Sequence, residues 1–240
     1  MKINGIDIKK YGAKQFRMDI GMPELKNESE WQTGAILPNL SGNAAMWKQI
    51  DLQLMVYGDN REQIRNRISN IEALMMEPIE LELDGTKRHF RGILQKASTD
   101  EGNDWIRERR QKMKLQIDAY EHGEEVQYSS GDETLIRVTN PGNMESPVRI
   151  EITPRIGLVN YTINGVCRDS VTGEDLPIII NDLTRGKKII VDGIDGIVEE
   201  DGAGKNIDLW ALPSVPPGEN VVTVSNTFCD VTITVLPLYV

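Results

Sequence analysis

The chain is poor in the residues from which chemical sites and crosslinked scaffolds are built. Its 240 residues include two histidines, two cysteines and three phenylalanines. Two cysteines, Cys167 and Cys229, are too few for the disulfide framework of a small secreted domain, so we expect reduced thiols. The first ten residues hold no apolar run of secretory-signal length. The longest aliphatic runs, such as 178–180, have the length of strands. We therefore expect a soluble protein that is made in a cytoplasm and does not insert into membranes.

Familiar catalytic and metal-binding motifs are also missing. We expect His89 on a strand and His122 in a linker, and neither has a metal-ligand partner at short spacing. CxxC, HExxH and Gly-x-Ser-x-Gly do not occur. The stretch 202–206, Gly-Ala-Gly-Lys-Asn, lacks the upstream glycine and the following hydroxyl residue of a phosphate loop, so it is interpreted as a turn. These absences predict no enzyme activity, no catalytic residue, no metal and no cofactor. A carboxylate pair for glycoside cleavage stays open, because such pairs meet in space and not in sequence.

The chain is strongly acidic. It has 37 Asp and Glu residues against 27 Lys and Arg residues, a formal net charge of −10 and a pI near 4.8. This balance argues against sequence-specific DNA binding and against a surface that wraps duplex DNA, since both need clustered Lys and Arg. An acidic surface repels nucleic acid, which is useful where DNA must pass without sticking.

One acidic stretch, 192–201, invites a calcium hypothesis. The spacing of an EF-hand loop is not met there, and Asp and Gly are the usual turn formers. We therefore expect exposed turns rather than a calcium site. The acidic residues concerned are Asp192, Asp195, Glu199, Glu200 and Asp201.

The second half of the chain predicts an all-β domain. Short apolar runs alternate with turn signals, and no helical period interrupts them. The signals are Asn-Pro-Gly-Asn at 140–143, Asn-Gly at 164–165, Thr-Gly at 172–173, Arg-Gly at 185–186, Asp-Gly at 192–193, 195–196 and 201–202, and Pro-Pro-Gly at 216–218.

The first half predicts an α+β domain that is mainly β with one helix. Residues 59–62 have capping-box spacing, and apolar residues recur at helical spacing until Pro78, which predicts a helix over about 60–77. Period-two alternation predicts strands over 2–8, 48–57, 79–83, 88–94 and 112–120. We interpret 21–43 as a long loop with a short strand over 31–37, and 98–110 as a charged hairpin tip. The resulting domains are 1–125, a linker over 126–133, and 134–240.

The four tryptophans admit two interpretations. They could be platforms for stacking sugars, or they could belong to the core or to subunit interfaces, where Trp is enriched. The residues are Trp31, Trp47, Trp105 and Trp210.

Taken together, the chain resembles the distal tail protein family of long-tailed bacteriophages, a resemblance that rests on the joint order of local features over nearly the full length. In the first half these are Met-Val-Tyr-Gly-Asp-Asn at 55–60, a helix ending in Leu-Met-Met-Glu-Pro at 74–78, the strand pair within 79–94, and the long strand at 112–120. In the second half they are Asn-Pro-Gly-Asn at 140–143, Ser-Pro-Val-Arg-Ile at 146–150, Gly-Lys-Lys-Ile-Ile-Val-Asp at 186–192, Pro-Gly-Glu-Asn at 217–220, and a last strand at 231–235.

The resemblance implies a virion protein of the phage tail tip, assembled in the cytoplasm of the bacterial host. The first domain would form a hexameric ring between the tail tube protein and the tail-associated hub protein of the baseplate. The second would be a galectin-like β-sandwich on the outside, available to receptor-binding proteins. With 240 residues the chain has no room for an inserted carbohydrate-binding domain, and it lacks the His, Asn and Arg set that galectins use for sugar.

The charge and the long polar segments of the chain are compatible with a ring. A passage for DNA benefits from an acidic lining, and head-to-tail contacts close by rotation. We predict that Trp31 and Trp105, in the loop and the hairpin tip, lie at the interface between copies. Two alternatives stay open: a carbohydrate-binding adhesion module of a phage tail or cell surface, and a tail-tube subunit, which would have one domain rather than two.

Overall fold

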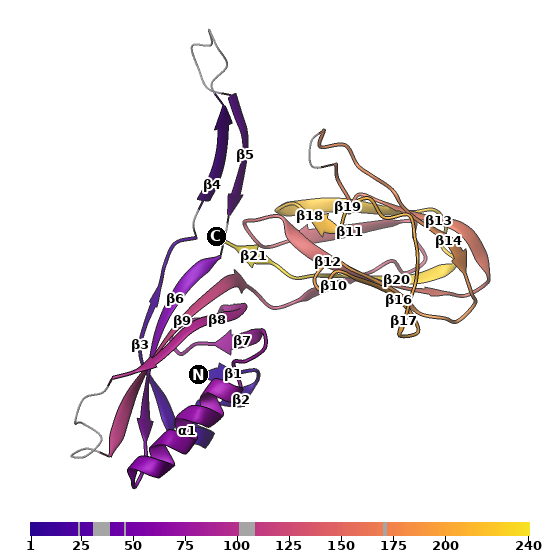
Figure 1. Cartoon of the computed structure of the whole chain (residues 1–240). Helices are drawn as coiled ribbons and strands as arrows, with labels where there is room; N and C mark the ends of the chain where they lie inside the picture. Colours follow the sequence, from indigo (N-terminus) through magenta and orange to yellow (C-terminus); the bar gives the residue numbers. More distant parts are fainter. Residues whose placement is uncertain (24, 31–38, 46, 101–108, 170–171) are drawn as a thin grey trace. The chain divides into compact units, whose positions relative to one another are not determined.

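The computed structural model describes residues 1–23, 25–30, 39–45, 47–100, 109–169 and 172–240. These residues form two compact units, Met1–His122 with Val240, and Gly123–Tyr239 (Figure 1). No helix in the described part is long and apolar enough to cross a membrane.

The first unit is built on one antiparallel sheet with the strand order β2-β1-β7-β8-β9-β6-β3. The alternation at 48–57 is confirmed as β6, and the predicted strand at 112–120 lies inside the longer β9. The strands of this sheet are β1 (Lys2–Ile3), β2 (Ile6–Asp7), β3 (Ala13–Ile20), β6 (Lys48–Tyr57), β7 (Ile79–Glu82), β8 (His89–Thr99) and β9 (Arg110–His122). The single strand predicted over 2–8 is wrong, because β1 and β2 pair with each other around a turn in which Asn4 and Gly5 have positive φ. A 3-10 helix, η1 (Ile8–Tyr11), follows β2.

The predicted helix exists, but with another cap and an earlier end. In α1 (Arg61–Ala73) the N-cap is Asn60, whose side chain accepts a hydrogen bond from the Gln63 N–H at 2.9 Å. The Gln63 side chain in turn accepts from the Asp59 N–H at 2.6 Å, so the reciprocal pair is shifted by one residue from the predicted one. The helix ends four residues before Glu77, because Pro78 sets only an outer limit to it.

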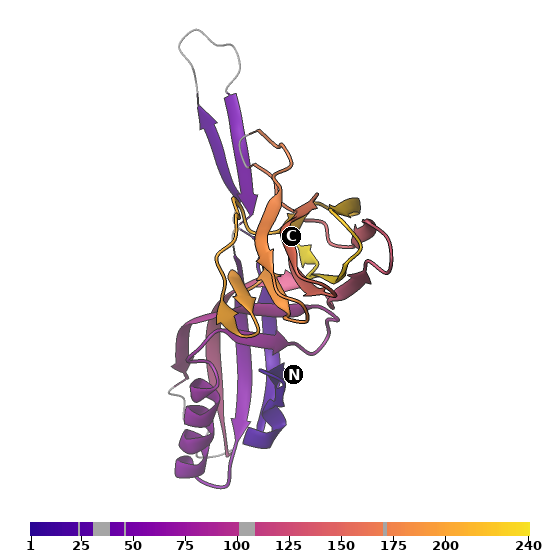
Figure 2. The same cartoon turned by 90° about the vertical axis from the view of Figure 1, so that its right-hand side faces the viewer.

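The core of the first unit lies between α1 and one face of the sheet. The helix buries Ile64, Ile68 and Ile71, and β6 buries every second residue from Ile50 to Val56. Figure 2 shows α1 running along this face. Glycine is required at position 92, where an added Cβ would lie 2.1 Å from the Asp118 backbone oxygen.

The stretch 21–43 is not the predicted long loop. It contains β4 (Leu25–Glu30), which pairs antiparallel with β5 (Asn39–Ala45) as a separate two-stranded sheet. The chain leaves from the end of β3 and returns at the start of β6, and these two strands pair with each other. Neither segment alternates apolar with polar residues, so the period-two pattern could not reveal them. The predicted short strand at 31–37 lies outside the described residues.

The second unit consists of strands arranged in two antiparallel sheets. One has the order β10-β20-β12-β15-β16-β17, with β18 also paired to β12, and the other has the order β11-β19-β13-β14. The strands of the first are β10 (Val126–Ser129), β12 (Ser146–Pro154), β15 (Ile189–Asp192), β16 (Ile197–Glu200), β17 (Ala203–Gly204), β18 (Ser214–Val215) and β20 (Cys229–Val235). Those of the second are β11 (Leu135–Asn140), β13 (Leu158–Asn164), β14 (Ile178–Leu183) and β19 (Gly218–Val224). A short last strand, β21 (Leu238–Tyr239), ends the chain.

Both sheets contribute to one hydrophobic core. Alternate residues of β12 and β20 face alternate residues of β11, β13, β14 and β19, the pattern of sheet-on-sheet packing. The predicted linker over 126–133 is wrong in its first half, because Val126–Ser129 form β10 and pair with residues 232–235. Val126 and Tyr128 do alternate with polar residues, but this edge strand has only four residues, too few for the alternation to stand out.

Candidate functional site

The two tryptophans predicted at a subunit interface, Trp31 and Trp105, lie outside the described residues. Of the other two, Trp47 is 44% exposed and Trp210 is 79% exposed. Neither is a core residue. A place in the core therefore cannot account for these two tryptophans.

The acidic stretch 192–201 is held by structural contacts. The Asp192 side chain is nearly buried and accepts hydrogen bonds from the N–H groups of Ile194 and Asp195, at 2.8 and 3.2 Å. Its second oxygen accepts from Arg149 Nε at 2.6 Å, and this carboxylate raises the pKa of Arg149. Glu200 lies 3.1 Å from Lys205 Nζ. Within the described part of the chain, no group of three or more His, Cys, Asp and Glu residues could hold a metal ion.

The structure brings the two histidines together, which their spacing in the sequence did not suggest. His122 lies on β9 and not in a linker, directly opposite His89 on β8. Their ring centroids are 5.5 Å apart, and His122 Nε2 lies 2.7 Å from Glu80 Oε1. Tyr120 and Trp47 extend this row of rings, with centroid distances of 6.0 Å and 5.9 Å. An imidazole and a carboxylate alone make no triad, which also needs a nucleophile.

The cysteines are buried free thiols in the second unit. Cys229 begins β20, and Cys167 donates from its thiol to the Ala211 carbonyl at 3.1 Å. Burial raises the pKa of Cys167 to about 12 and that of Cys229 to about 11. Both thiols therefore stay protonated and inert near neutral pH.

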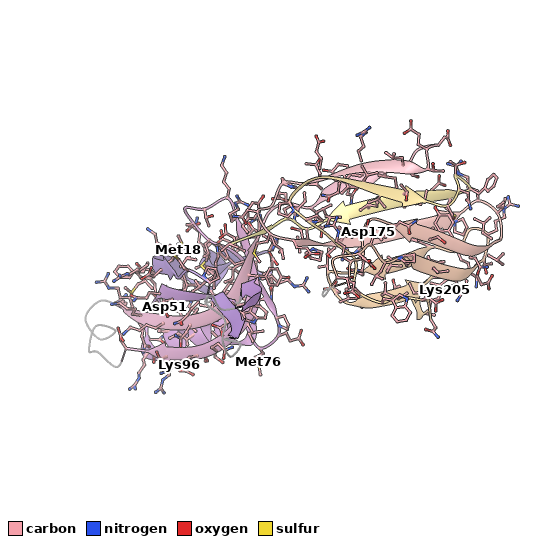
Figure 3. The ribbon with its side chains drawn as sticks, turned by 90° about the horizontal axis from the view of Figure 1, so that it is seen from above. Met18, Asp51, Met76, Lys96, Asp175 and Lys205 are labelled. Atoms are coloured by element: carbon pink, nitrogen blue, oxygen red, sulfur yellow. The ribbon has the colours of Figure 1, made fainter. Side chains whose placement is uncertain are left out.

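The face of the first sheet opposite α1 is open and polar. Two rows of side chains cross β3, β6, β9 and β8 in register and line a shallow hollow of about 380 Å³. The rows are Asp19, Asp51, Gln116, Lys96 and Arg17, Gln53, Lys114, Ser98. Figure 3 labels Asp51 and Lys96 on this unit. Acidic and basic side chains are mixed here, so this face is neither acidic nor a basic patch for nucleic acid.

The net charge of the chain belongs to the second unit alone. Residues 123–239 hold 18 Asp and Glu residues against 8 Lys and Arg residues, a net charge of −10. Residues 1–122 hold 19 of each and are neutral. The charge of the whole chain led us to expect an acidic lining in a ring built by the first domain. Because the first unit is neutral, that charge no longer supports the expectation.

Comparison with known proteins finds likeness in solved structures only. No family model matches the chain, and no curated protein does. The Dit protein (gp 19.1) of phage SPP1, a paradigm of the hub adsorption apparatus in phages that infect Gram-positive bacteria, is 14% identical with a TM-score of 0.69. The match covers 99% of this chain and 98% of that one.

Two structures of the phage P2 baseplate in its activated conformation are also similar. The calcium form matches with 9% identity and a TM-score of 0.54, and the strontium form with 11% and 0.55. Each match covers 95% of this chain and 92% of that one. At this identity the likeness shows the fold: the chain has a Dit-like fold, mostly β with one helix, as the resemblance to distal tail proteins predicts.

Proposed function

We propose that the chain is a distal tail protein, a structural and non-enzymatic component of the phage tail tip. Its first unit closes a hexameric ring that joins the tail tube protein to the tail-associated hub protein. Its second unit is a galectin-like β-sandwich on the outside, available to receptor-binding proteins. The protein acts in the virion and is assembled in the host cytoplasm. The observation that carries the proposal is the likeness to SPP1 Dit over 99% of this chain and 98% of that one.

The distribution of charge supports a ring made by the first unit. Copies of the second unit carry −10 each and repel one another at short range. At physiological ionic strength this repulsion is screened beyond about 8 Å, so it acts mainly against direct contact between second units. The neutral first unit carries no such penalty.

Two surfaces of the first unit have distinct roles in this proposal. The open polar face, with Asp51 and Lys114 among its residues, faces the passage, because its mixture of acidic and basic side chains makes no basic patch for DNA. The segments that hold Trp31 and Trp105 reach neighbouring copies, where Trp supplies a large contact area.

Light scattering after size-exclusion chromatography, with electron microscopy of the peak, tests the ring. We expect a mass of six times 27.0 kDa and particles with six-fold symmetry. Trp31→Ala and Trp105→Ala lower this mass, whereas Trp210→Ala, on the second unit, leaves it unchanged. A strict monomer at high concentration, unaffected by either interface substitution, contradicts the proposal.

The carbohydrate-binding alternative has one observation in its favour, the 79% exposure of Trp210, since sugars stack on exposed indole rings. A glycan array probed with the protein and with Trp210→Ala decides it. Binding that disappears in the variant supports this alternative, and an array without signal removes it.

A further inference from the structure

Three large apolar side chains are exposed on two neighbouring segments of the second unit. Trp210 is 79% exposed, Leu212 is 50% exposed and Ile197 is 49% exposed. Trp210 and Leu212 flank the less exposed Ala211, and the chain bends at Trp210 and Ala211. Ile197 follows Gly196, whose added Cβ would lie 3.8 Å from Leu212 Cδ1, so the turn before β16 lies against Leu212. We call these three residues the Trp210 surface.

The segment that displays Trp210 is fixed in place. Asp208 forms a backbone bridge with Ile179 of β14, with N–O distances of 3.1 and 3.2 Å. On the other side of Trp210, the Ala211 carbonyl accepts from the Cys167 thiol, and the Pro213 carbonyl accepts from the Val148 N–H at 3.0 Å. Ile207 and Leu209, on either side of Asp208, pack on the core. An exposed indole on a pinned segment loses little conformational entropy on binding, which is the property of a preorganised anchor.

The surroundings of the Trp210 surface are acidic. Asp208 faces outward two residues before Trp210, and Asp195 precedes the turn that touches Leu212. Glu145 accepts from the Ser214 hydroxyl at 2.5 Å, two residues after Leu212. Two arginines near this rim are paired: Arg149 with Asp192 at 2.6 Å and Asp195 at 3.6 Å, and Arg168, next to Cys167, with Asp175 at 3.3 Å. They offset part of the acidic charge. An apolar centre with a charged rim is the usual anatomy of a protein–protein interface, and this rim is complementary to a basic partner.

We propose that the Trp210 surface docks a separate protein that offers an apolar pocket for the Trp210 indole, flanked by lysine or arginine side chains. The proposal names the chemistry of the partner of the second unit and so rests on the proposed function. A second copy of this unit fits poorly, because it carries the same charge of −10. An anionic cell-wall polymer is repelled by the same charge.

Site-specific photocross-linking tests this. Trp210 is replaced by p-benzoylphenylalanine in cells that make the protein in its native setting. As a matched control, the same replacement is made at Val221, which lies on β19 and is 48% exposed. Cross-linked peptides are identified by mass spectrometry. We expect position 210 to capture a different protein through a peptide of net positive charge. Capture of a second copy of this chain, of an acidic peptide, or of no more than the control position captures overturns the proposal.

The captured partner is then purified and its affinity for the full chain is measured. Trp210→Ala weakens binding about 30-fold or more, as expected for a central aromatic anchor. Asp208→Lys slows association and flattens its dependence on salt, whereas Val221→Ala changes neither. Equal affinity of the protein and Trp210→Ala overturns the proposal. We expect each variant to keep the mass of the unsubstituted protein in light scattering. The affinity measurement therefore tests docking, and the mass tests the ring independently.

Discussion

Substitution of Asp192 tests whether the acidic stretch 192–201 is structural. The Asp192 side chain caps the turn after β15 through the N–H groups of Ile194 and Asp195, and it pairs with Arg149. Asparagine keeps a side-chain carbonyl for the turn but removes the charge that faces the guanidinium. Alanine removes both. The two variants therefore separate the contribution of the turn from that of the ion pair.

The expected loss follows from the burial of the two partners. Hydrogen bonds to charged groups contribute about 1.5–3 kcal/mol, and breaking a fully buried pair costs about 3–5 kcal/mol. The Asp192 side chain is 7% exposed, but that of Arg149 is 27% exposed and keeps Asp195 at 3.6 Å. We expect Asp192→Asn to lower the free energy of unfolding by about 2 kcal/mol and Asp192→Ala by about 3 kcal/mol. At roughly 4 °C per kcal/mol, the asparagine variant melts about 8 °C lower.

Urea unfolding and calorimetry, each with and without calcium, measure these losses. The matched control is Asp175→Asn, which removes the same charge from the exposed pair with Arg168 and costs about 0.5 kcal/mol or less. An asparagine variant as stable as this control would refute the structural interpretation. So would a calcium-dependent rise in Tm of the unsubstituted protein that Asp192→Asn abolishes.

Two further predictions concern backbone packing and the buried thiols. Gly92→Ala forces β8 away from the Asp118 carbonyl and costs about 1–3 kcal/mol or more in urea unfolding, while Gly204→Ala, with no atom within 4 Å of the added Cβ, changes little. Because burial raises the pKa of Cys167 to about 12 and of Cys229 to about 11, the folded state keeps protons that the unfolded chain releases near pH 9. Stability is therefore full below pH 9 and falls as pH rises above it, by on the order of 1.4 kcal/mol per pH unit for each thiol. Replacing both cysteines with alanine reduces this slope in Tm measured from pH 8 to 10.5, and an unchanged slope contradicts the assignment.

Local patterns predicted the elements whose own residues are half-buried. The strand at 48–57 has one face on the core along its whole length, so alternation fixes its bounds. The apolar stripe of α1 was visible for the same reason, although its N-cap depended on which of Asp59 and Asn60 takes the extended conformation. The pair β4–β5 left no such trace in the sequence, because neither segment alternates apolar with polar residues.

Features that depend on strand register were not readable from the chain. His89 and His122 meet because β8 and β9 pair in one particular register, and a shift of one residue would place them on opposite faces. The exposure of Trp210 likewise follows from the pinning of its segment by distant groups such as Ile179. The sequence signal for the Trp210 surface was modest: Trp210 and Leu212 alternate with the less exposed Leu209 and Ala211.

The net charge of the whole chain also did not reveal how charge is distributed between the two units. That distribution distinguishes ring formation by the first unit from partner docking by the second. A net charge of −10 for the whole chain suggests an acidic surface throughout. In the structure the first unit is neutral and the second unit carries the whole net charge of −10. Contacts between neutral first units respond weakly to ionic strength. Docking at the acidic rim of the Trp210 surface weakens as salt shortens the Debye length from about 10 Å at 0.1 M to about 3 Å at 1 M. We therefore expect added salt to release the docked partner while the mass of the oligomer stays constant. If partner and oligomer dissociate together, the two units do not have separate roles.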